Sequence, residues 1–126
     1  MSVAKEILGD TVVFTLGEIY TLSDFIYFWD MVMKDTPELE EVLSAKHIII
    51  DCTKLKGVEQ TAGEIFFLQQ KFERRNEGRF SYCGLGAEQK RLFTLLSGDV
   101  TKSAQPRIQN FLSRQEAMES ILAGDT

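Results

Sequence analysis

The segment Glu59-Gln60-Thr61-Ala62-Gly63-Glu64 places a hydroxyl between two acids. Thr61 followed three residues later by Glu64 is a capping-box pattern, which opens a helix by satisfying its first free N–H groups. On this interpretation Thr61 caps a helix and contributes about 1 kcal/mol. The same hydroxyl is a candidate phosphoacceptor, because a helix N-terminus tolerates a phosphate that changes the charge by about −2. The two roles are compatible, since a capping threonine can also be phosphorylated.

The other residues that could perform chemistry are two cysteines and one histidine. Cys52 and Cys83 lie within apolar, strand-like sequence, where an intracellular protein keeps packed and reduced thiols. His47 precedes Ile48-Ile49-Ile50 and is explained as the start of a strand. The sequence therefore predicts neither a zinc site nor a Ser-His or Cys-His dyad. We expect a protein that is not an enzyme and that holds no metal and no cofactor.

The composition limits the possible binding partners and the cellular location of the protein. The chain has 126 residues, of which 44% are hydrophobic and 26% charged, so one domain spanning residues 1–126 is expected. Its net charge of −5 argues against nucleic acid as a partner. Residues 1–51 hold ten acids and three bases, whereas residues 52–126 hold nine acids and eleven bases. The longest apolar run is far below the roughly 18 residues of a membrane span, and no leader is recognised, so we expect a cytoplasmic protein without membrane insertion.

Strands and helices alternate along the chain. Two apolar, β-branched runs around Gly9-Asp10 predict a hairpin, and Thr36-Pro37 predicts the start of a short helix. The expected strands are residues 3–8, 11–16, 46–52, 79–84 and 107–112. The expected helices are residues 22–34, 37–44, 61–76, with Gly78 as its stop, 87–96, and a last helix opened by Ser113 and Glu116. The order ββαβαβαβα predicts an α/β fold, a mixed β-sheet covered by helices with residues 46–52 as central strand.

The two long helices carry more apolar residues than one narrow stripe needs. In the first, the helical period predicts an inward stripe of Leu22, Phe25, Ile26, Trp29, Val32 and Met33. Tyr27 and Met31 then project nearly opposite, either as isolated exposed residues or as a homodimer or docking surface. In the second, Phe66 or Phe67 is expected near the edge of the buried face, either as part of a wide core face or as an anchor for a partner.

Several of these features together resemble a known family. The element order, the strand Ile48-Ile49-Ile50-Asp51 followed eight residues later by Glu59, and the run Thr61-Ala62-Gly63 are similar to the STAS domain. That domain occurs in bacterial anti-sigma factor antagonists and sulphate transporters, and the similarity covers nearly the whole chain. The resemblance implies a non-enzymatic signalling protein in transcription regulation, which binds a serine kinase that is also the anti-sigma factor. The implied switch-loop and partner-binding residues are Asp51, Glu59, Gln60, Ala62, Gly63, Glu64, Phe66 and Phe67.

The family motif after the central strand is Asp-Ser-Ser-Gly, whose first serine is phosphorylated. Matching Glu59 to the family aspartate without a gap places Gln60 on the acceptor, which then lacks a hydroxyl. Inserting one residue between Lys54 and Val58 places Thr61 on the acceptor and keeps Gly63 in the motif. Both registers leave Thr61 as the hydroxyl close enough to be phosphorylated. The alternative function is an unswitched STAS module, a scaffold component or an accessory subunit of a phospholipid or anion transport complex.

Overall fold

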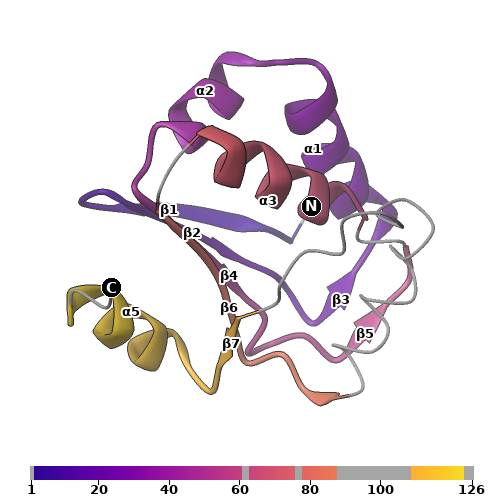
Figure 1. Cartoon of the computed structure of the whole chain (residues 1–126). Coiled ribbons are helices and arrows are strands. Elements are labelled where there is room, and N and C mark those ends of the chain that lie inside the picture. The colour runs from indigo at the N-terminus through magenta and orange to yellow at the C-terminus, as the bar shows by residue number, and fades with distance from the viewer. Residues whose placement is uncertain (1, 61–62, 76–77, 88–108, 124–126) are drawn as a thin grey trace.

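A five-stranded mixed sheet lies at the centre of the protein (Figure 1), with the strands in the order β1-β2-β4-β6-β7. The computed structural model describes residues 2–60, 63–75, 78–87 and 109–123. β1 and β2 form the predicted antiparallel hairpin, and the remaining neighbours are parallel. The strand bounds are Ala4–Leu8 (β1), Thr11–Thr15 (β2), His47–Asp51 (β4), Arg79–Cys83 (β6) and Asn110–Phe111 (β7). The predicted α/β fold is therefore confirmed.

β4 is the central strand, as its continuous apolar sequence predicts. Ile48, Ile49 and Ile50 are all fully buried, because neighbouring strands flank β4 and helices lie over both faces of the sheet. The hairpin turn is also explained locally, since Gly9 has a φ of 63°, which glycine adopts without strain.

Helices begin at the caps that the sequence supplies. The described helices are α1 (Leu22–Met33), α2 (Pro37–Leu43), α3 (Gly63–Arg75) and α5 (Arg114–Leu122). The Thr36 hydroxyl accepts from the Leu39 N–H, and the Ser113 hydroxyl accepts from the Glu116 N–H. The predicted helix 87–96 lies, apart from its first residue, outside the described residues, and the last strand is shorter than predicted.

A second sheet of two very short strands is absent from the sequence prediction. β3 (Ile19–Tyr20) pairs in parallel with β5 (Gly57–Val58). Two residues are too few to show a period of two, so the sequence predicts only a connection between residues 54 and 58. This small sheet nevertheless positions the connection between β5 and α3, because β5 leads directly into it.

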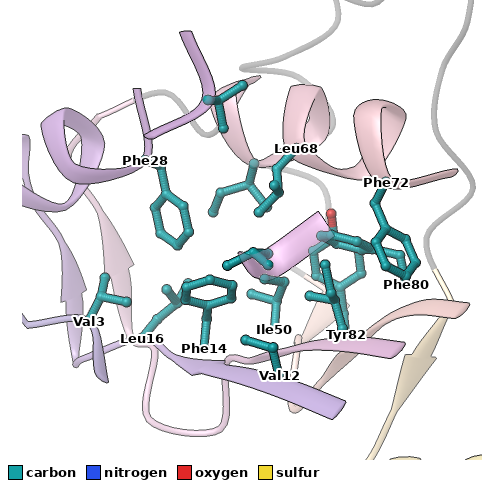
Figure 2. Close-up of a cluster of buried hydrophobic side chains, with 14 of the residues drawn as sticks. Val3, Val12, Phe14, Leu16, Phe28, Ile50, Leu68, Phe72, Phe80 and Tyr82 are labelled. Carbon is teal, nitrogen blue, oxygen red and sulfur yellow. The ribbon is translucent and has the colours of Figure 1, made fainter. Parts of the chain in front are cut away.

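The helices form a layer on each side of the main sheet. α1, α2 and α3 lie over one face and α5 lies over the other (Figure 1). The larger hydrophobic cluster fills the space between the sheet and the first three helices, with Phe14, Phe28, Leu68 and Phe72 pointing into it (Figure 2). A smaller cluster beneath the sheet joins Val13, Ile49, Cys83 and Ala117.

Gly78 is required for close approach of two backbones. A Cβ at this position would lie 1.6 Å from the carbonyl oxygen of Lys46 and 3.2 Å from the ring of Phe72. The sequence predicts Gly78 only as a helix stop. In the structure, glycine also allows the chain entering β6 to pass against the end of the α2–β4 connection.

The rotation of α1 differs from the predicted one. Leu22, Ile26, Trp29 and Met33 of the predicted inward stripe are exposed, whereas Val32 is buried. The face that packs on the sheet instead contains Asp24, Phe28 and Met31. Because α1 is apolar nearly all round, its period fits more than one inward face.

Asp24 explains the rotation that is observed. Its carboxylate accepts from the Ser2 N–H and from the Thr21 N–H, each over 2.9 Å, and is almost completely buried. Phe28 and Met31 follow at i+4 and i+7, so the face that holds Asp24 also turns these side chains into the core.

Candidate functional site

The connection from β4 to α3 begins at a turn that Asp51 builds. Asp51 Oδ1 accepts from the Thr53 N–H over 2.9 Å and from the Thr53 hydroxyl over 2.7 Å. Asp51 Oδ2 lies 3.7 Å from Arg114 Nε of α5. The carboxylate is nearly buried and faces α5, on the opposite side of the sheet from α3. Asp51 therefore stabilises the start of the β4–α3 connection from the α5 side of the sheet.

Tyr20 holds both ends of the segment 60–62. Its carbonyl oxygen accepts from the Glu59 N–H over 2.9 Å, on the β5 side. Its hydroxyl hydrogen-bonds to Glu64 Oε1, on the α3 side. Tyr20 belongs to β3, so one residue of the small sheet fixes the entrance and the exit of the segment that contains the candidate phosphoacceptor.

The first turn of α3 buries most of its side chains. Gly63, Glu64 and Phe66 are buried, whereas Phe67 is half-buried. The expected edge aromatic is thus Phe67, and Phe66 is a core residue whose ring contacts Tyr82 edge-on. A wide core-facing helix explains Phe66 without any partner.

The accessible part of the predicted site is small. Glu59 is exposed, and Gln60 and Phe67 are half-buried. Thr61 and Ala62 lie outside the described residues. Of the implied partner-binding residues, three side chains therefore reach solvent within the described part of the connection and α3.

Glu64 lies in the first turn of α3, and its side chain is unusually buried for a carboxyl group, at 2% exposed. Burial raises the pKa of its carboxyl to about 7, and the hydrogen bond from Tyr20 offsets this only in part. Burial and the neighbouring Glu64 carboxyl raise the pKa of the Tyr20 hydroxyl well above its ordinary value. Both groups are therefore neutral below about pH 7, with the tyrosine hydroxyl and a carboxylic acid sharing the bond.

Tyr27 and Met31 do not form an exposed surface, contrary to the expectation from the helical period. Met31 is 2% exposed. Tyr27 is half-buried, packs edge-on against Phe14 and Phe28, and donates its hydroxyl to Glu38 over 2.6 Å. The exposed apolar row of α1 consists instead of Leu22, Ile26, Trp29 and Met33.

The cysteines and the histidine are structural within the described chain. Cys52 and Cys83 are free and buried, as predicted, and belong to hydrophobic clusters on opposite faces of the sheet. Burial raises the pKa of the Cys83 thiol to about 12, so it is not an activated nucleophile at neutral pH. His47 starts β4, and its Nδ1 accepts from the Arg79 N–H over 3.3 Å. Among the described residues, no group of three His, Cys, Asp or Glu side chains could hold a metal ion.

Sequence comparison gives no match to a family model and none to a curated protein. Solved structures do match. The unphosphorylated form of the anti-sigma factor antagonist SpoIIAA superposes with a TM-score of 0.67 at 12% identity, covering 97% of this chain and 98% of that chain. The phosphorylated form of Bacillus SpoIIAA gives a TM-score of 0.64 at 14% identity, covering 94% and 98%. A candidate anti-sigma factor antagonist from Thermotoga maritima gives 0.66 at 14% identity, covering 95% and 94%.

These likenesses extend over almost the entire length of each chain and concern the fold. The protein has the STAS fold, as the resemblance in its sequence predicts. In this fold it resembles anti-sigma factor antagonists, one of which is solved both with and without a phosphate. In the described part of the chain, no helix has the length and apolar character to cross a membrane.

Proposed function

We propose that residues 1–126 form one STAS domain that acts in the cytoplasm as an anti-sigma factor antagonist. In this role the protein is not an enzyme but binds a kinase that is also the anti-sigma factor. The observation that carries the proposal is the match, over more than nine-tenths of the chain, to SpoIIAA in its phosphorylated and unphosphorylated forms. The net charge of −5 accords with a protein partner and not with nucleic acid.

The proposed binding surface is the exposed side of the β5–α3 connection. Glu59, Gln60 and Phe67 reach solvent there, and Phe67 offers an aromatic contact of the kind that dominates protein interfaces. Gly63, Glu64 and Phe66 support this surface from the core side.

Thr61 is the proposed switch within this surface. The kinase transfers the γ-phosphoryl group of ATP to the Thr61 hydroxyl oxygen, releasing ADP and the hydroxyl proton. The added charge of about −2, two positions after the exposed Glu59 in the sequence, weakens binding to the partner by desolvation and like-charge repulsion.

The experiment uses a purified serine kinase of the anti-sigma factor type, ATP and mass spectrometry of the product. We expect phosphate on Thr61, none on the Thr61→Ala variant, and weaker partner binding by Thr61→Glu. The control is Ser23→Ala, which removes an exposed hydroxyl at the start of α1, outside this connection, and should leave phosphorylation unchanged. Unmodified Thr61, together with equal binding by Thr61→Ala and Thr61→Glu, would contradict the switch.

That outcome would favour the alternative, an unswitched module in a scaffold or in a phospholipid or anion transport complex. The observation in its favour is Gln60, which occupies the acceptor position in the ungapped register and has no hydroxyl. A gene neighbourhood with a permease and a transport ATPase, and no kinase, would support it. Sedimentation of the purified protein tests separately whether it forms a homodimer.

A further inference from the structure

Tyr20 and Glu64 connect parts of the chain that are far apart in sequence. The two residues are 44 positions apart, and their hydrogen bond is buried between β3 and the first turn of α3. The Glu59 N–H meanwhile donates to the carbonyl oxygen of the same tyrosine. Opening the Tyr20–Glu64 bond would release the exit of the segment 60–62 while its entrance stays paired in the small sheet.

We propose that Tyr20 and Glu64 form a proton-gated clamp on the β5–α3 connection, closed when Glu64 is protonated. The regulatory meaning of the clamp rests on the proposed function, because the connection contains the proposed switch residue. Its existence as a conformational device depends only on the geometry of these two side chains.

Burial favours the neutral carboxylic acid of Glu64. Glu64 is buried against Tyr20, and no described side chain forms a salt bridge with it. Lys71, on the same helix, donates to the Val32 carbonyl oxygen over 2.7 Å. An ionised Glu64 therefore gains by reaching water, which requires the first turn of α3 to move. On the described elements around the pair, the titratable and charged groups are Asp24 and Asp30 of α1, Glu18, Lys56 and Glu59 beside the small sheet, and Lys71, Glu73, Arg74 and Arg75 of α3.

The opening of the clamp is linked to pH with a definite sign. When closed, Glu64 keeps its proton up to about pH 7, and in the open form it ionises near its ordinary value of 4.5. The open population therefore grows as the pH rises through this window and stays constant above it. The whole increase amounts to roughly 300-fold, the factor that corresponds to the separation of the two pKa values.

A phosphate on Thr61 would also favour the protonated form of Glu64. A group carrying about −2 charges, three residues before Glu64, disfavours ionisation of the closed form further. Phosphorylation at Thr61 should thus be accompanied by proton retention on Glu64 or by opening of the turn.

Hydrogen exchange of the full chain tests the clamp without a partner or a kinase, so its failure is distinct from failure of the proposed function. After correction for intrinsic exchange rates, amides of residues 63–68 should open roughly 70-fold more often at about pH 8 than at about pH 5, the part of the whole increase that falls between these two pH values. The Glu64→Gln variant, which stays neutral and keeps an acceptor for Tyr20, should show no such increase. Glu73→Gln makes the same change at an exposed position of α3 and should behave as the wild type.

Two further measurements test the clamp independently of the exchange experiment. The Tyr20→Phe variant, which lacks the hydroxyl, should already show the open turn at about pH 5. Carbon NMR of the Glu64 carboxyl should give a midpoint near 7. A midpoint near 4.5, an equal rise in exchange for Glu64→Gln, or amides of residues 63–68 that open only together with those of β4 would overturn the proposal.

Discussion

Two methionines of α1 offer a matched test of how this helix is rotated. Met31 is 2% exposed and Met33 is 38% exposed, two residues apart on the same helix. The helical period of the sequence assigns them the opposite way, with Met33 inward and Met31 outward. Truncating each to alanine compares the same chemical change on the two faces.

The expected costs follow from burial. Met31→Ala removes a fully packed side chain from the core beneath α1 and should lower the free energy of unfolding by about 3 kcal/mol, within the usual range for such truncations. Met33→Ala removes a side chain that already contacts water and leaves no closed cavity, so its cost should stay below about 1 kcal/mol. In a domain of this size, the first change should lower Tm by roughly 10 °C.

Urea denaturation followed by far-ultraviolet circular dichroism measures both costs in one experiment. An unchanged m-value in the two variants would show that the denatured state is not altered. Equal costs, or a larger cost for Met33→Ala, would refute the burial argument and favour the rotation that the sequence period suggests.

Two other changes test the site and the fold. Glu64 binds its proton up to about pH 7 in the folded protein but only up to 4.5 when unfolded, so the stability of the wild type should fall between these values. Glu64→Gln should remove this fall and be more stable than the wild type by up to roughly 3 kcal/mol at about pH 8 in urea denaturation, whereas a parallel loss in both proteins would exclude a buried, titrating Glu64. Gly78→Ala places a Cβ 1.6 Å from the Lys46 carbonyl oxygen, and the displaced backbone should cost about 2 kcal/mol or more of unfolding free energy in the same assay. Gly57→Ala, with no atom within 4 Å of its Cβ, should cost less than about 1 kcal/mol, and similar losses in the two glycine variants would contradict the close approach at Gly78.

Part of the candidate site follows from the sequence because its signals are local. The continuous apolar run of β4, the acid at its end and the helix that follows all lie within about 30 residues of chain. These features predict a loop beside a central strand, and they locate Glu59, Gln60 and Thr61. The sequence does not indicate that Phe66 is buried while Phe67 is half-buried, since both fit the wide apolar face of α3.

Tyr20 is the residue of the site that sequence reasoning missed. It stands in a strand of two residues, too short for any period, and its partner Glu64 is 44 positions away. The sequence offers one signal for a buried partner, since Glu64 is an acid followed by apolar residues at the start of a helix. The capping-box pattern assigns Glu64 to the helix cap instead.

By itself, the sequence determined the strands of the main sheet, the described helices and the order of these elements, because turns, caps and alternating polarity act between residues a few positions apart. Gly9, Thr36 with Pro37, and Ser113 stand where these local rules place them. Tertiary structure alone decided which face of α1 is buried and that Tyr20 meets Glu64. An apolar helix can turn several faces inward with similar burial, and the choice depends on contacts such as Asp24 with Ser2, which exist only once distant segments have packed together.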